Sequence, residues 1–239
     1  MPGAERIIVY GPGGVGKSTL CSHLPDPVFV DVESGTRRLA ITRAKGADTW
    51  DFQNLRDALL ALRTSPRKTI VIDSATRVEE LAVAHTLKTV KNDKGQAVSS
   101  IEGYGFGKGY QHLFETAMLF FSDLDALVRM GKNVALITHE RVVEAPNPFG
   151  ENFLRYAPAL SAPQSGKWSI RDRAVQWADY VFFIAYDVAA DDRKGIGAGT
   201  RTIYAQERPS HIAKARKAIE PVPWNDPKTA TIWKEIFTS

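Results

Sequence analysis

The chain alternates short apolar runs with longer segments in which apolar residues recur every three or four positions. Such runs are typical of strands buried on both faces of a parallel sheet, and the longer spacing predicts amphipathic helices. Their alternation indicates an α/β fold, a mainly parallel twisted sheet with helices on both faces. Strands are expected at 7–10, 28–33, 69–74, 133–139, 180–186 and 200–206, with a short extended piece at 49–51. Helices are expected from residue 17 to before Pro25, at 36–44, around 55–62, at 77–87, at 110–130, around 170–177 and around 232–237.

Two long segments interrupt this alternation. Residues 88–109 and 140–168 show no sustained period, and four prolines make the second too broken for a regular helix. Loops of this length are usually functional or mobile. A glycine-rich turn is expected at 195–199, and the tail at 221–239 is expected to dock on the body. We expect a single domain over residues 1–239.

The composition narrows the class of protein. Hydrophobic residues make up 44% of the 239 residues and charged residues 24%, which are values of globular proteins. No apolar run approaches the roughly 18 residues that span a bilayer, so we expect no membrane association and a cytoplasmic location. The single cysteine, Cys21, excludes an intramolecular disulfide. A net charge of +4 permits a polyanionic partner without requiring one.

The most specific motif follows the first predicted strand. Residues 11–18 read Gly-Pro-Gly-Gly-Val-Gly-Lys-Ser and match the phosphate-binding (Walker A) pattern, in which backbone amides and a helix N-terminus converge on an anion. In this pattern the lysine reaches the β- and γ-phosphates, and the serine hydroxyl ligates Mg²⁺. We therefore expect a nucleotide site that binds ATP with Mg²⁺. Its residues are Gly11, Pro12, Gly13, Gly14, Val15, Gly16, Lys17, Ser18 and Thr19.

A second pattern occupies the same stretch. Gly11, Gly13 and Gly16 also spell the dinucleotide-binding pattern, with Asp31 and Glu33 about 20 residues further on, where an acid would bind a ribose. A dinucleotide fold has no use for a lysine and a serine at the start of the helix. The triphosphate interpretation is therefore favoured.

Three polar residues end other predicted strands, and the carboxyl ends of parallel strands meet at one edge of a sheet. Asp73 has the position that holds the Mg²⁺ shell in phosphate-loop proteins. Many ATPases carry a water-positioning glutamate directly after this aspartate, but here that residue is Ser74. Glu33 is therefore expected to be the catalytic base, the alternative being a solvated carboxylate. His139 is either a γ-phosphate sensor coupled to the following loop or a structural histidine.

The order of these motifs resembles the RecA-like core of phosphate-loop ATPases. More narrowly, the chain resembles the phage-encoded ATPases of the Sak group, which act in single-strand annealing and recombination. The resemblance implies a RecA-like fold, single-stranded DNA as a partner, a homo-oligomer in the form of a ring or filament, and a bacterial host cell as the location. A single-strand DNA-binding protein is a further candidate partner.

The resemblance also implies roles for residues outside the phosphate loop. Lys214 and Arg216 match the Lys-x-Arg element with which RecA-core and KaiC-like proteins reach the γ-phosphate of a neighbouring subunit. The alternative is a solvated basic strand end. The two long segments, 88–109 and 140–168, occupy the places where RecA-like proteins carry DNA-binding loops. Both combine cations, which track phosphates, with aromatic rings, which stack on unpaired bases. The alternative is that these aromatic residues only pack beneath a lid.

Together these expectations describe an ATPase. The catalytic residues would be Lys17, Glu33, Asp73 and His139, and hydrolysis would be stimulated by DNA. Two alternatives stay open, a nucleoside or nucleotide kinase with the second long loop as its lid, and a non-catalytic nucleotide-dependent switch. The expected DNA-binding residues are Lys91, Lys94, Tyr104, Phe106, Lys108, Arg141, Arg155 and Lys167.

Overall fold

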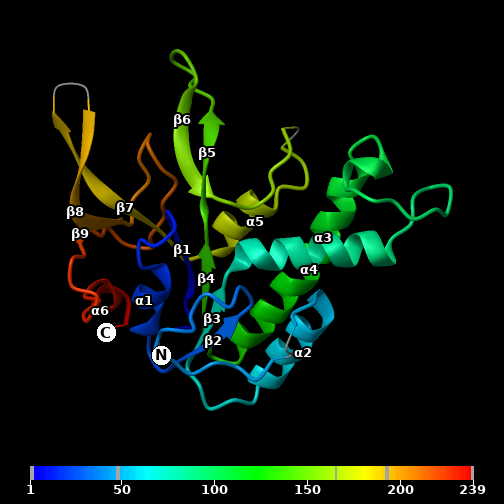
Figure 1. The fold of residues 1–239 in the computed structure, drawn as a ribbon, viewed down its shortest axis with the longest axis horizontal. Helices are drawn as coiled ribbons and strands as arrows, with labels where there is room; N and C mark the ends of the chain where they lie inside the picture. The colour runs from blue at the N-terminus through cyan, green and yellow to red at the C-terminus, as the bar shows by residue number, and fades with distance from the viewer. Residues whose placement is uncertain (1–2, 47–48, 165, 192–193, 238–239) are drawn as a thin grey trace.

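A seven-stranded, mostly parallel sheet forms the centre of the molecule (Figure 1). The structure, a computed structural model, describes residues 3–46, 49–164, 166–191 and 194–237. The strand order is β2-β3-β4-β1-β7-β8-β9; the first five strands are parallel, and β8 and β9 are added antiparallel. The strands of this sheet are β1 (Arg6–Tyr10), β2 (Pro27–Asp31), β3 (Thr69–Asp73), β4 (Asn133–Thr138), β7 (Tyr180–Asp191), β8 (Lys194–Tyr204) and β9 (Val222–Pro223).

Helices cover both faces of the sheet. Because side chains alternate along a strand, Ile8 and Tyr10 belong to the core beneath α2 to α5, whereas Ile7 and Val9 belong to the core beneath α1 and α6. The predicted α/β fold, a mainly parallel twisted sheet with helices on both faces, is therefore confirmed. The helices are α1 (Lys17–Ser22), α2 (Phe52–Leu62), α3 (Ala75–Thr89), α4 (Lys108–Arg129), α5 (Ile170–Trp177) and α6 (Ile232–Phe237), with a 3-10 turn η1 (Glu102–Tyr104) before α4.

The helix expected at 36–44 is wrong. This segment forms turns and a short bridge from Phe29 to Arg43. The Asp31 carboxylate accepts hydrogen bonds from the Gly35 and Thr36 backbone, and the Arg43 guanidinium donates to the carbonyls of Thr36 and Leu39. These bonds occupy backbone groups that a helix would need. The extended piece expected at 49–51 does not form a strand. Its last residue, Asp51, is the N-cap of α2 and accepts a hydrogen bond from the Asn54 N–H.

The segment 140–168 contains a hairpin that the sequence pattern did not predict. Strand β5 (Glu140–Ala145) pairs antiparallel with β6 (Phe153–Pro158). The prolines at 146 and 148 fall between the two strands, and Pro158 ends β6, so none interrupts the ladder. Since β5 follows β4 after one residue, this hairpin projects from the carboxyl edge of the sheet, at the top of Figure 1.

The turn expected at 195–199 is also wrong, because these residues lie in β8. Strands β7 and β8 pair from Phe183 and Tyr204 outward to Asp191 and Lys194, and the ladder shifts register once, between Tyr186 and Val188. Glycines retain both backbone hydrogen-bonding groups, so they can continue such a ladder. The β7–β8 hairpin projects on the same side of the molecule as β5–β6 (Figure 1).

The tail packs against the body through α6. Ile232, Trp233 and Ile236 are buried in the core shared with α1, and the Trp233 indole N–H donates to the Leu20 carbonyl at 2.8 Å. Among the helices of the described residues, none has both the length and the apolar character needed to cross a membrane.

Candidate nucleotide-binding site

The phosphate loop, residues 11–18, connects the end of β1 to the start of α1. A Cβ added at Gly11 would lie 2.2 Å from the carbonyl oxygen of Ile184 in β7, so only glycine fits beside that strand. Gly16 has a φ of 102°, in the left-handed region that favours glycine, and directly precedes Lys17. The loop is thus held close to the sheet, and its end leads directly into the N-terminus of α1.

Lys17 lies across this loop. Its side chain is 8% exposed, and its Nζ donates to the carbonyls of Gly11 and Pro12, both at 2.8 Å. Burial lowers the pKa of the Lys17 ammonium, while the negative charge of Asp73 acts in the opposite direction. The ammonium is therefore placed to exchange these two carbonyls for the oxygens of a bound phosphate.

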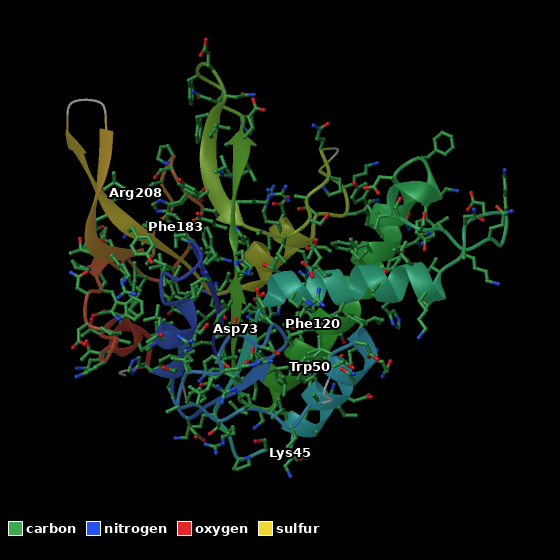
Figure 2. All side chains as sticks on the ribbon, in the orientation of Figure 1. Lys45, Trp50, Asp73, Phe120, Phe183 and Arg208 are labelled. Carbon is green, nitrogen blue, oxygen red and sulfur yellow. The ribbon has the colours of Figure 1, made fainter. Side chains whose placement is uncertain are left out.

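Ser18 and Asp73 form an oxygen pair beside the loop. The Ser18 hydroxyl donates to Asp73 Oδ2 at 2.5 Å, and Asp73 lies at the end of β3, near the centre of the molecule in Figure 2. Burial raises the pKa of the Asp73 carboxyl, and the bond from Ser18 lowers it. Mg²⁺ commonly binds through one or two carboxylates together with substrate phosphates and water, and a carboxylate beside a hydroxyl suits this ion. Among the described residues there is no cluster of three or more His, Cys, Asp or Glu able to hold a metal.

Glu33 and His139 meet at the same edge of the sheet. His139 Nε2 lies 3.0 Å from Glu33 Oε1, and the Glu33 backbone N–H donates to the Asp73 carbonyl at 3.1 Å. Burial is the largest single influence on the Glu33 pKa and raises it, but bonds from Ser74 and His139, with the charge of Lys17, outweigh burial and lower the pKa. Glu33 is thus kept ionised, as a base must be, so the imidazole donates the bond.

His139 also anchors the β5–β6 hairpin. It is the single residue between β4 and β5. Its backbone N–H donates to the Thr76 hydroxyl at 3.1 Å, and its carbonyl accepts from the N–H of Ala159 at 2.9 Å, just after β6. A displacement of His139 would therefore act on both strands of the hairpin.

Comparison with known families agrees with this geometry. The family model described as AAA domain (AAA_24) matches residues 4–217, which is most of the chain. The chain belongs to the AAA domain family. AAA domains are phosphate-loop ATPases, so ATP and its usual Mg²⁺ follow from the family as the expected ligands.

The chain is also similar to a solved structure. The crystal structure of a KaiC-like protein from the hyperthermophilic archaeon Pyrococcus horikoshii aligns with a TM-score of 0.45 at 15% sequence identity. The alignment covers 93% of this chain and 86% of that chain. None of the curated proteins compared matches the chain.

Lys214 and Arg216 lie away from the phosphate loop of their own chain. Lys214 pairs with Val181 near the start of β7, toward the opposite edge of the sheet. Its Nζ donates to three carbonyls at the C-terminal end of α5, the shortest bond being 2.6 Å to Ala178. Arg216 donates through Nε to Asp179 at 2.9 Å. Both cations are bonded within their own chain, so a role at a neighbouring subunit stays a prediction.

In the first predicted DNA-binding loop, residues 88–109, one of the predicted DNA-binding residues is buried. Tyr104 is 7% exposed, and its hydroxyl donates to the carbonyls of Thr86 and Val90, so it packs beneath the loop rather than on its surface. Phe106, two positions on, is fully exposed. Lys91 and Lys94 are exposed, and Lys108 forms an ion pair with Asp93.

The second loop places its residues along the hairpin and beyond it. Arg141 is exposed on β5, and Arg155 on β6 forms an ion pair with Glu207 at 2.7 Å. Lys167 is exposed on the segment between β6 and α5. At the end of the hairpin, Phe149 is 97% exposed. The structure does not gather the predicted residues of the two loops into one cluster, because the α3–α4 loop extends to the right of Figure 1 and the hairpin to the top.

Two residues at the phosphate loop were missed by the sequence reasoning. Arg201 of β8 donates through Nη1 to the Val15 carbonyl at 2.7 Å, and its guanidinium lies 4.8 Å from the centre of the Trp224 ring. The sequence held one usable signal, and it concerned Arg201. Because side chains alternate along a strand, Arg201 shares a face of β8 with Ile203, and this face lies on the α1 side of the sheet.

Proposed function

We propose that the chain is an ATP- and Mg²⁺-dependent ATPase that binds single-stranded DNA and acts as a homo-oligomer in annealing or recombination. The observation that carries the proposal is the Glu33–His139 pair. It joins the expected water-positioning base to the foot of a projecting hairpin. The Glu33–His139 pair would thus connect the site of ATP hydrolysis with the hairpin that contacts DNA. Encoding by a phage, as in the Sak group, belongs to the same proposal.

The residues of the site have distinct tasks in this reaction. The loop amides and Lys17 bind the β- and γ-phosphates and place positive charge where negative charge develops. Ser18 and Asp73 would hold Mg²⁺, which neutralises phosphate charge when bound. Glu33 orients a water toward the γ-phosphate and accepts its proton, and His139 holds the Glu33 carboxylate in place.

The case for single-stranded DNA rests on exposed rings and cations on projecting loops. Phe149 and Phe106 are almost completely exposed, at 97% and 102%, so neither contributes to a core. Arg141 on the hairpin and Lys91 and Lys94 on the other loop supply positive charge. Cations that track a backbone and rings that stack on bases suit single strands without sequence preference.

The proposal is tested with the wild-type protein. Anisotropy of a labelled single-stranded oligonucleotide is measured during a salt titration, with and without a non-hydrolysable ATP analogue, and ATP turnover is measured with and without DNA. We expect binding that weakens with salt and turnover that rises with DNA. No binding at low salt in either state would refute the DNA partner, and no turnover under any condition would refute the ATPase.

A further inference from the structure

Strand β8 and the segment after β9 meet behind the phosphate loop. Arg201 is paired with Tyr186 across the β7–β8 ladder. The backbone N–H of Trp224 donates to the Arg201 carbonyl at 2.7 Å, and the Arg201 N–H donates to the Asn225 side chain at 2.9 Å. These bonds fix Arg201 and Trp224 relative to each other on the α1 side of the sheet.

The side chains of Arg201 and Trp224 both pack against Gly16. A Cβ added at Gly16 would lie 2.8 Å from Arg201 Nη1 and 3.0 Å from the Trp224 ring, so the pair fills the space behind that residue. Trp224 is 3% exposed, and its indole N–H donates to the Thr229 carbonyl at 2.7 Å. The ring is therefore immobilised by the tail on one side and by the loop on the other.

The contact between Arg201 and Val15 has a directional consequence. In a trans peptide the carbonyl and the following N–H point in opposite directions. When the Arg201 guanidinium holds the Val15 carbonyl, it also sets the direction of the Gly16 N–H, one of the amides of the phosphate-binding motif. A charged donor at the carbonyl polarises the peptide, which strengthens the N–H as a donor.

We propose that Arg201, held by the Trp224 ring, is a positioning residue that orients the Gly16 amide toward a bound nucleotide phosphate. The inference rests on the nucleotide binding in the proposed function and adds to it. Trp224 lies beyond residue 217, where the match to the AAA domain family ends. The tail therefore has a role at the nucleotide site in addition to docking α6.

The test measures nucleotide affinity directly, independent of hydrolysis. The dissociation constant of a fluorescent ADP analogue with Mg²⁺, the KM and kcat for ATP, and the melting temperature without nucleotide are compared for five full-length variants. Arg201→Gln removes the charge, and Trp224→Leu removes the ring. Trp224→Phe retains an aromatic face. Arg208→Gln is the matched control, because Arg208 also lies over an aromatic ring, Tyr204 at 5.4 Å, and its backbone is hydrogen-bonded to His211. Trp233→Phe removes a tail bond to α1.

For Arg201→Gln and Trp224→Leu we expect the dissociation constant and KM to rise about tenfold, the equivalent of one charge-assisted hydrogen bond. We expect a smaller change in kcat, and recovery of most of the affinity in Trp224→Phe. Arg208→Gln and Trp233→Phe should bind as wild type, although Trp233→Phe melts at a lower temperature. Unchanged affinity in Arg201→Gln, or an equal loss in both controls, would overturn the inference. Absence of binding by the wild type would instead refute the nucleotide site itself.

Discussion

The Glu33 carboxylate is held by His139, with 3.0 Å between Oε1 and Nε2, although 106 positions separate the two residues in the chain. Glu33 follows β2, His139 follows β4, and Asp73 ends β3 between them in the sheet. Parallel pairing therefore brings the expected base, its partner and the expected metal ligand to one edge. Both side chains stay about two-fifths exposed, so a water molecule can reach them.

Replacing Glu33 by glutamine tests the identity of the base. Glu33→Gln keeps the shape and the hydrogen bond to His139 but cannot accept a proton, so we expect kcat to fall about 100- to 10,000-fold. Affinity for ADP should stay within about twofold, since the phosphate contacts come from the loop. Turnover and ADP binding are measured side by side. Glu140→Gln is the comparison, because Glu140 also lies near Lys17 and burial raises its pKa. Loss of turnover in Glu140→Gln, with normal turnover in Glu33→Gln, would show that Glu33 is not the base.

Replacing His139 tests the connection to the hairpin. His139→Phe removes the bond to Glu33 while retaining a planar ring. We expect kcat without DNA to fall about tenfold, the equivalent of one ordinary hydrogen bond. Stimulation by single-stranded DNA should be lost, whereas affinity for the oligonucleotide should persist. Turnover is measured with and without DNA. Normal stimulation in this variant would mean that His139 is a structural histidine, the other interpretation that its sequence position allowed.

The sheet and most of the site were predictable from sequence for one physical reason. Apolar runs mark buried strands, and in a parallel sheet their carboxyl ends coincide, so the sequence alone predicts that Asp73, Glu33 and His139 lie together. The glycines before Lys17 marked the loop because few other residues tolerate that backbone.

Features that depend on contacts between distant segments were not predictable. Four prolines hid the β5–β6 hairpin, since a proline between strands looks the same in sequence as one that breaks a strand. The bonds from Asp31 and Arg43 that replace the expected helix at 36–44 depend on the position of β2. Arg201 and Trp224 reach Gly16 through pairing of β8 and β9, which no local pattern encodes.

The exposed phenylalanines offer a test of the DNA contact. Phe149→Ala and Phe106→Ala should leave the melting temperature unchanged, because both rings are exposed. Loss of one stacked base corresponds to about 1–3 kcal/mol, so affinity for a single-stranded oligonucleotide should fall about 5- to 150-fold for each ring that stacks. Anisotropy measures the affinity, with Met130→Ala, an exposed apolar residue after α4, as the control. Equal affinity in all three variants would exclude these rings from the DNA interface.

The Asp179 carboxylate makes the free energy of unfolding depend on pH in the acidic range. The side chain accepts bonds from the Arg6 backbone and guanidinium at 2.9 to 3.1 Å. Burial raises the Asp179 pKa, but these bonds and that from Arg216 outweigh burial and lower it below its usual value of 3.8. A lowered folded-state pKa stabilises the fold above the unfolded-state value, and this stabilisation is lost as pH falls from about 4 through the folded-state pKa. Asp179→Asn should cost about 3 kcal/mol at pH 7 and show a shallower fall of the urea midpoint below about pH 4. An unchanged acid profile in Asp179→Asn would contradict this assignment.

Lys214 and Arg216 can be assigned by mixing variants. If they act at a neighbour's nucleotide, Lys214→Ala and Arg216→Ala will bind ATP but hydrolyse it poorly. Each substitution also removes bonds inside its own chain, so loss of activity alone does not separate a structural role from a role in trans. Lys17→Ala disables a subunit's own phosphate loop and leaves its Arg216 intact. A mixture of Lys17→Ala with Arg216→Ala should therefore regain turnover, because some sites combine a functional loop with a neighbour's arginine. If no turnover is regained in the mixture, the role of Arg216 would be limited to its ion pair with Asp179 within its own chain. Melting temperatures of the separate variants provide the control for folding.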